Sequence, residues 1–413
     1  MNHNKLTYFT LLFSLLFASL PSQAQRHEII SNRIASLQVV AGNNWLGLPI
    51  TTLQGGAINI DFDDMTHDYH RYTYKLEHCD ANWDVTTGLF ETDYMQGFNG
   101  ELRIEQMEQS FNTNHLYTHY HLAIPNDNCH IKMSGNYKIT VYDDDADEAM
   151  FAAYFMILEP EMKVGISYTS NTDIDINRSH QQVVLQVDYN NIHVNNPQSQ
   201  LTTVVLQNGR WDNAAINPKS DYQRYSGMEW RHCKQLIFKA GNEYRKFEML
   251  DMDHPTMGID DIKWDGKEYH AFVMPDQPRP NYVYDESAKG AFYIRNSDNE
   301  DIHTTSEYAQ VHFTLQAPRQ EGDVYLNGDW TCDRFLPEYR MDYDAATQSY
   351  HTSILLKQGY YSYQYLVLKA NGETEHVSTE GDYFQTANRY DALIYYRGTG
   401  DRTDRLVGWS SLK

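Results

Sequence analysis

The stretch YYSYQYLVLKANGETEHVS, residues 360–378, indicates the fold of this chain more clearly than any other segment. Tyr361, Tyr363, Tyr365 and Val367 alternate with other residues, so they fall on one face of an extended strand. Asn371-Gly372 then supplies a turn in which both central positions accept positive φ, and ETEHVS returns as a second strand. The segment therefore predicts a β-hairpin with a tyrosine-rich buried face.

The same period-two alternation recurs along the chain, which contains 32 Tyr and 16 Phe. It is found in RYTYKLEH (71–78), GNYKITVY (135–142), QQVVLQVDY (181–189) and VHFTL (311–315). Asn-Gly turn signals also stand at residues 99–100, 208–209 and 327–328. Helical periodicity is rare, and its best candidate is a short turn in ELRIEQMEQ, residues 101–109. Short strands separated by turns predict an all-β fold of tandem immunoglobulin-like β-sandwiches.

The sequence suggests two domain boundaries, and neither is sharply marked. One lies near Glu159-Pro160, after the apolar strand MFAAYFMILE, and the other near Gln316-Ala317-Pro318. We therefore expect an N-terminal β-sandwich domain over residues 25–160, a middle β-rich domain over 161–316 and a C-terminal immunoglobulin-like domain over 317–413.

The first 24 residues have the three parts of a secretory signal peptide. Lys5 precedes the apolar run Leu6–Leu20, and Ser22 and Ala24 suit cleavage after Ala24. The alternative, a retained membrane helix, is disfavoured because the run is shorter than the roughly 20 residues that span a bilayer. No later segment is apolar enough to cross as a helix. We expect a periplasmic protein that is not itself inserted in the membrane.

The formal net charge of −23 excludes two classes of partner. An acidic chain repels nucleic acid and anionic lipid headgroups, so neither is expected to bind. The acidity is spread along the chain, which is typical of a soluble surface.

Four cysteines are widely spaced, and three pairings between them stay open: Cys79, Cys129, Cys233 and Cys332. One buried disulfide or none is expected. Three of the cysteines have an adjacent histidine: His78-Cys79, Cys129-His130 and His232-Cys233. Adjacent residues of a strand point to opposite faces, so such pairs are poorly placed to hold one zinc ion. We predict no metal site from them.

Acidic runs at residues 61–64 (DFDD) and 143–148 (DDDADE) raise a calcium hypothesis. The second run lacks the EF-hand spacing and is better explained as a solvated hairpin. A glycosidase pair among 56 acidic residues is not identifiable from sequence. The chain has no GxSxG, P-loop, HExxH or dinucleotide-binding pattern. We therefore expect no enzyme and no cofactor.

Tryptophans near turns are either exposed platforms for a partner or members of a β-sandwich core, at Trp45, Trp83, Trp211 and Trp330. Of these, Trp211 and Trp330 are the candidate partner-binding residues.

The C-terminal unit, with VYLNGDW (324–330) and LLKQGYYSYQYLVLKANG (355–372), resembles the early-set immunoglobulin-like domains of glycogen-binding modules. The second tryptophan of those modules is missing from TCDRFLPEYR after Trp330. This resemblance supports the fold more than sugar binding, and it makes a carbohydrate-binding envelope protein the alternative function.

Seven unusual strings stand together in one order and spacing. They are HCDANW (78–83), SFNTNHLYTHYHLAIPN (110–126), SGNY (134–137), QNGRWDNA (207–214), GNEYRKFE (241–248), LLKQGYYSYQY (355–365) and the ending from EGDYFQTANRY (380–390) onward. From about Arg33 to Gly408 the chain resembles the plug protein family of the type IX secretion system.

This resemblance implies a periplasmic protein without catalytic activity. Its implied partner is the large outer-membrane β-barrel translocon, whose periplasmic opening it occludes when no cargo is engaged. None of the shared strings is carried over as a contact with the barrel.

Overall fold

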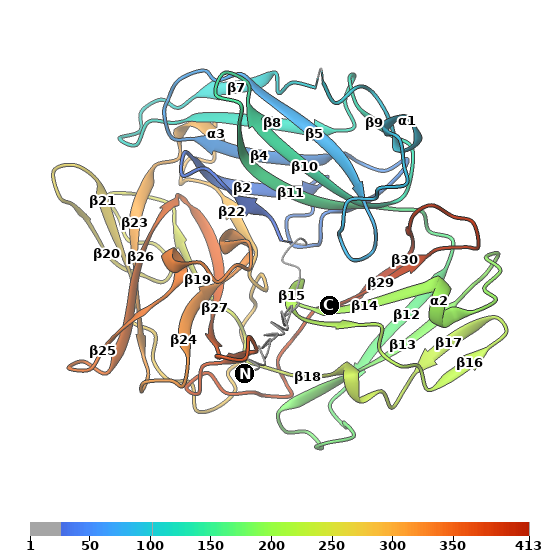
Figure 1. Ribbon diagram of the computed structural model, residues 1–413. Helices are drawn as coiled ribbons and strands as arrows, with labels where there is room; N and C mark the ends of the chain where they lie inside the picture. The colour runs from blue at the N-terminus through green and yellow to red at the C-terminus, as the bar shows by residue number, and fades with distance from the viewer. Residues whose placement is uncertain (1–25, 101, 413) are drawn as a thin grey trace, which may run out of the picture.

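The computed structural model describes residues 26–100 and 102–412, so the expected signal peptide, residues 1–24, lies outside the described part. Three β-sandwiches are arranged around a common centre (Figure 1). The described α-helices are single turns: α1 (Glu91–Tyr94), α2 (Pro197–Gln200) and α3 (Ile302–Thr305). Within the described ranges, none of the helices has the length and apolarity needed to cross a bilayer.

The first sandwich, at the top of Figure 1, is formed by residues 28–158. One sheet contains β1 (Glu28–Ile29), β11 (Glu148–Leu158), β10 (Gly135–Asp143), β5 (Tyr72–Cys79) and β3 (Ile50–Thr52). The other contains β2 (Ile34–Ala41), β4 (Ile58–Asp64), β8 (Thr118–Ile124) and β7 (Gln106–Gln109). A small pair, β6 (Met95–Gln96) and β9 (His130–Ile131), closes one end. Strand β7 occupies the place where the sequence predicted a helical turn, and that prediction is wrong.

The second sandwich combines two distant parts of the chain. One sheet contains β12 (Lys163–Thr169), β13 (His180–Asp188), β17 (Gly227–Trp230), β16 (Tyr222–Arg224) and β18 (Ile237–Lys239). The other contains β15 (Arg210–Ile216), β14 (Leu201–Gln207), β29 (Tyr390–Tyr396) and β30 (Arg405–Leu412). A 3₁₀ turn, η1 (Lys234–Leu236), precedes β18.

The third sandwich is inserted between β18 and β29. One layer contains β19 (Arg245–Met249), β27 (Gly359–Leu368), β22 (Phe292–Ile294), β24 (Asp323–Asn327) and β28 (Thr374–His376). The other contains β20 (Ile259–Trp264), β21 (Tyr269–Val273), β23 (Tyr308–Gln316), β26 (Ser349–Lys357) and β25 (Asp342–Asp344). The 3₁₀ turns η2 (Asp329–Thr331) and η3 (Pro337–Tyr339) follow β24.

The sheets therefore divide the chain differently from the expected boundary at 316/317. That boundary falls between β23 and β24, two strands of the same sandwich, and the last two strands belong to the second sandwich. The period-two alternation of apolar residues predicts a strand and its apolar face, but it does not predict which distant strand pairs with it. The boundary near 160 falls in the link between β11 and β12.

The predicted apolar faces are the faces that fill the cores. The alternating residues of β5, β10, β13, β23 and β27 are buried, including Tyr74, Ile139, Leu185, Phe313 and Tyr363. Aromatic and β-branched side chains suit such half-buried pleated surfaces. The all-β sandwich fold is thus confirmed.

Strand β11 is apolar on both faces because it packs against two layers. Its odd-numbered residues Phe151, Ala153, Phe155 and Ile157 enter the core of the first sandwich. Its even-numbered residues, from Ala152 to Leu158, form a second cluster with β14, β29 and β30. The sheets of the first and second sandwiches thereby stack in four continuous layers.

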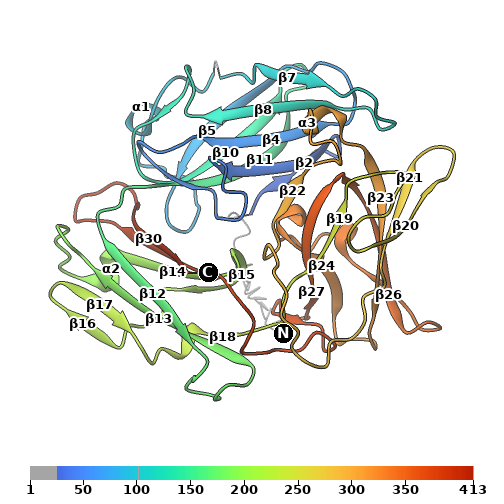
Figure 2. The same cartoon turned by 180° about the vertical axis from the view of Figure 1, so that it is seen from behind.

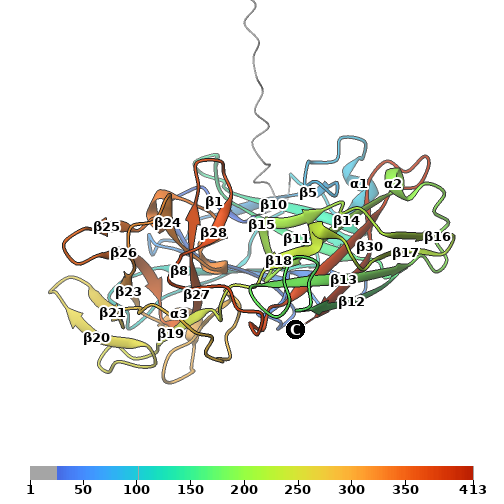
Figure 3. The same cartoon turned by 90° about the horizontal axis from the view of Figure 1, so that it is seen from below.

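The three sandwiches together form a plate. Viewed from the front or from behind, they surround a centre as three lobes (Figures 1 and 2). Viewed from below, the same body is flatter than it is wide (Figure 3).

A substitution at Tyr361 of β27 tests the core of the third sandwich. Tyr361 is 1% exposed, stacks on Phe247 with ring centroids 5.2 Å apart, and donates its hydroxyl to the Lys357 carbonyl at 2.6 Å. We expect Tyr361→Ala to lower the free energy of unfolding by about 3–5 kcal/mol in urea denaturation, because a cavity replaces the ring. The control Tyr284→Ala, 67% exposed, is expected to change it by less than about 0.5 kcal/mol. Equal losses in both variants would contradict this core.

Candidate functional site

The two outer faces of the first sandwich differ in chemistry. The face of β11 is apolar and docks on the second sandwich, as described above. On the opposite sheet, Ile60 and Phe62 of β4 point into the core. Asp61 and Asp63 alternate with them and face outward, toward the third sandwich. A charged face has thus been brought against another domain.

Asp63 and Lys357 form an ion pair inside this interface. The Nζ of Lys357, at the end of β26, lies 2.6 Å from Oδ2 of Asp63, and both side chains are 1% exposed. The same oxygen accepts the Tyr308 hydroxyl at 2.6 Å, and the ammonium also donates to the His303 carbonyl at 2.7 Å. The ammonium lies 4.0 Å from the ring centroid of Tyr117, which adds a cation–π contact.

Burial and pairing act in opposite directions on the Asp63 carboxyl. Burial alone would raise its pKa, but Lys357 and the hydrogen bond from His119 hold the pKa below its usual value. Burial lowers the pKa of Lys357 although Asp63 favours its charged form. Each charge is therefore tolerated because the other domain supplies its partner.

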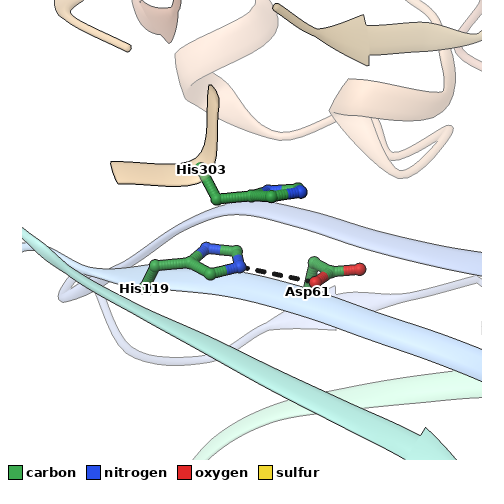
Figure 4. A group of neighbouring side chains, drawn as sticks. All are labelled: Asp61, His119 and His303. Atoms are coloured by element: carbon green, nitrogen blue, oxygen red, sulfur yellow. Dashed lines mark ion pairs between the residues drawn. The ribbon is translucent and has the colours of Figure 1, made fainter. Parts of the chain in front are cut away.

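His119 of β8 joins this pair to a second carboxylate. Its Nδ1 lies 2.8 Å from Oδ1 of Asp63, and its Nε2 lies 3.4 Å from Oδ1 of Asp61. Burial would lower the pKa of His119, but the hydrogen bonds to Asp61 and Asp63 raise it above its usual value. The ring stacks on His303 of α3 with centroids 4.6 Å apart (Figure 4).

Hydrogen bonds around this cluster close the interface. Tyr117 donates to the Ser306 carbonyl at 2.8 Å, and Ser36 and Tyr308 share a hydroxyl bond of 2.7 Å. The carboxylate of Glu307 accepts the backbone N–H groups of Asn114 and His115. Because these partners come from both sandwiches, the docking geometry is fixed at several points.

The second sandwich is joined to both others by buried polar contacts as well. Thr403 donates to Asp80 at 2.7 Å, and Tyr395 donates to Asn136 at 2.9 Å. The Asp212 carboxylate forms an ion pair with Arg210 of its own strand and accepts a hydrogen bond from the Thr374 hydroxyl of the third sandwich. A cavity of about 110 Å³ remains where the three sandwiches meet.

The structure places the two candidate tryptophans apart. Trp330 is 7% exposed and donates its indole N–H to the Ser362 carbonyl at 3.0 Å, inside the core of the third sandwich. Its ring has no free face on which a sugar could stack. Trp211 is half-buried against Trp83, with ring centroids 5.7 Å apart, and lines the central cavity. Partner binding by Trp211 stays a prediction.

All four cysteines fall within the described residues, where they are buried and unpaired. Burial raises the pKa of Cys79 to about 12, so the inert thiol form is favoured. Among the described residues no cysteine belongs to a group with metal-ligand spacing. Residues 144–148 of the second acidic run lie exposed in the β10–β11 turn.

Sequence reasoning found the acidic run at 61–64 but missed its partner. The signal was the lysine in SILLKQGYY, where an ionisable side chain interrupts an apolar strand pattern. A buried charge requires a counter-charge, so Lys357 predicts an acidic partner without naming Asp63.

These observations define a class: an all-β protein whose sandwiches are joined by an apolar sheet that packs on both faces and by the buried Asp63–Lys357 ion pair, called the ionic lock below. Residues 34–159 match the family described as type 9 secretion system plug protein, first domain. A crystal structure of a hypothetical protein from Parabacteroides merdae is 36% identical, with a TM-score of 0.91 over 94% of this chain and 100% of that one. The chain belongs to the type IX secretion system plug protein family, which assigns it to protein secretion in the cell envelope.

Two further structures share only 8% identity. The C-terminal domain of the antigen I/II-family protein AspA of Streptococcus pyogenes has a TM-score of 0.16, with 92% of this chain and 99% of that one covered. Latent PorU of Porphyromonas gingivalis has a TM-score of 0.14, with 94% and 33% covered. Neither likeness bears on the fold or the function. No curated protein matches the chain.

The ionic lock is tested by removing one partner. Lys357→Met leaves the Asp63 carboxylate buried beside an apolar side chain, so we expect a loss of about 3–5 kcal/mol in the free energy of unfolding. Urea denaturation measures this loss. Lys263→Met is the matched control, because the Lys263 side chain is 64% exposed in its pair with Asp261, and a change of at most about 1 kcal/mol is expected.

A double variant separates the lock from simple loss of packing. Asp63→Asn combined with Lys357→Met removes both charges, so it is expected to be less destabilised than Lys357→Met alone. If Lys357→Met lowered the free energy of unfolding as little as Lys263→Met does, the Asp63–Lys357 pair would not stabilise the fold.

Proposed function

We propose that this protein binds the periplasmic opening of the outer-membrane translocon barrel of the type IX secretion system and occludes it, without catalysing a reaction. The observation that carries the proposal is the plate of three interlocked sandwiches in a member of this family (Figures 1 and 3). A seal over a wide opening must be broad, and it must resist deformation where the opening gives it no support. Linked domains that moved independently would leave gaps.

The interfaces between the sandwiches support this role. Domains in one chain move relative to one another unless their interface is large and apolar. Here the β11 layer packs on β14, β29 and β30 through apolar side chains, and the third sandwich is held by the Asp63–Lys357 pair. Both features favour one body over three hinged ones.

Association with the barrel is tested by affinity capture. The full chain, carrying a C-terminal tag and exported by its own leader, is recovered from detergent-solubilised outer membranes, and its partners are identified by mass spectrometry. We expect a very large outer-membrane β-barrel protein to be recovered in near-stoichiometric amount, and not with a tagged unrelated periplasmic protein. Recovery of the chain without any barrel protein would contradict the proposal.

Occlusion is tested separately, by permeability. Deleting the gene is expected to let a solute that the outer membrane normally excludes enter the periplasm, because the opening is left uncovered. Complementation with the wild-type chain or with Lys263→Met is expected to restore exclusion. Lys357→Met, which loosens the third sandwich, is expected to restore it less well at equal protein level. Unchanged permeability in the deletion strain would contradict occlusion, and only binding to the barrel would remain of the proposal.

A further inference from the structure

Asp61, His119 and His303 lie together at the edge of the interface between the first and third sandwiches. Each offers one ligand atom, and these atoms all lie within 4.8 Å of one another. Asp61 and His119 come from neighbouring strands of the first sandwich, β4 and β8, whereas His303 comes from α3 of the third. Figure 4 shows the His303 ring over the His119 ring, which is joined to the Asp61 carboxylate beside it.

His119 is oriented as a metal-binding histidine is oriented. Its Nδ1 lies 2.8 Å from the buried Asp63 carboxylate, so Nδ1 carries a proton and donates it. In the neutral ring the lone pair is then on Nε2, which faces Oδ1 of Asp61 at 3.4 Å. A histidine that binds a metal through one ring nitrogen usually donates the N–H of the other nitrogen to a carboxylate, as His119 does to Asp63.

The separations suit a transition-metal dication with small adjustments. Two ligands about 2.0 Å from a tetrahedral ion lie roughly 3.3 Å apart, which is close to the His119–Asp61 distance. His303 must approach further, and it is exposed at its place on the single helical turn α3. Two imidazoles and one carboxylate favour zinc over calcium, which takes oxygen ligands.

Other charged groups also lie around the three residues. Lys357 is the nearby cation, but its ammonium contacts the far oxygen of Asp63, which it neutralises. His121 lies on the same face of β8, with Nδ1 2.7 Å from Oδ1 of Asp61, where it steadies that carboxylate or completes the ligand set. Among the described residues, the ion-pair partners of Asp61 are histidines, with no lysine or arginine.

We propose that Asp61, His119 and His303 bind one Zn²⁺ ion, which cross-links the first and third sandwiches. This goes beyond the proposed sealing function, because it concerns what holds the plate together and not what the plate covers. The ion bonds to Nε2 of His119, an imidazole nitrogen of His303 and a carboxylate oxygen of Asp61. The fourth position is taken by water or by His121.

A second group in the described residues, Asp265, Glu268 and His270, provides an internal comparison. It is less suited to a metal, because Oδ1 of Asp265 already accepts the backbone N–H groups of Lys267 and Glu268. All three residues also belong to the β20–β21 hairpin, so an ion bound there would join no two sandwiches.

The test is calorimetric titration of the metal-free mature chain, purified without a polyhistidine tag, with Zn²⁺ alone. We expect one ion per chain, and a melting temperature that rises with Zn²⁺ and falls again with EDTA. His303→Ala removes an exposed ligand and is expected to weaken binding by at least about 100-fold, more than loss of an outer partner costs. His270→Ala is the matched control and is expected to bind as the wild type does.

Asp61→Asn gives an independent variant of unchanged shape, and it is expected to lose the ion as His303→Ala does. Circular dichroism verifies that each variant is folded. The proposal is overturned if the wild-type chain takes up no Zn²⁺, in which case the cluster binds protons only. It is equally overturned if His303→Ala binds as tightly as the wild type, or if binding is lost in His270→Ala instead.

Discussion

The sheet containing β14, β29 and β30 is buried on both faces, and the architecture depends on this. Ala392 and Ile394 pack into the second sandwich, whereas Leu393 and Tyr395 pack against β11 of the first. Burying apolar surface stabilises by about 25 cal/mol per Å² wherever the covering layer comes from. One sheet therefore fills a core and forms a domain interface at the same time, which prevents the first two sandwiches from hinging freely.

The third sandwich is held differently. It is inserted into the second through two connections, and it meets the first through Asp63, Lys357 and the hydrogen bonds around them. Replacing a buried ion pair with apolar residues often stabilises a protein, so such a pair is retained for reasons other than stability alone. In this chain it fixes one docking geometry, because each charge finds its partner only when the third sandwich is correctly placed. The proposed sealing function requires that constraint.

Local patterns predicted the strands and their buried faces, because side-chain direction alternates along any strand. Pairing was not predictable: Leu201 of β14 lies opposite Tyr396 of β29, and nothing between them marks that register. Turn signals succeeded where the flanking strands also paired. Asn208 and Gly209 both have positive φ in the β14–β15 hairpin, whereas Gly328 is extended and leads into η2.

In the candidate site, too, the local pattern was predictable from the sequence and the distant partners were not. The acidic run at 61–64 was visible, but its meaning depended on Lys357 and His303, which only the folded chain brings near. The resemblance to the plug family was drawn from seven strings in register, and the family match over residues 34–159 confirms membership.

The most direct measurement is a cryo-electron microscopy structure of the translocon complex captured through this chain. We predict density across the periplasmic opening, with the three sandwiches in the arrangement of Figure 1. Sandwiches separated from one another, or a chain attached to the side of the barrel with its opening clear, would contradict it.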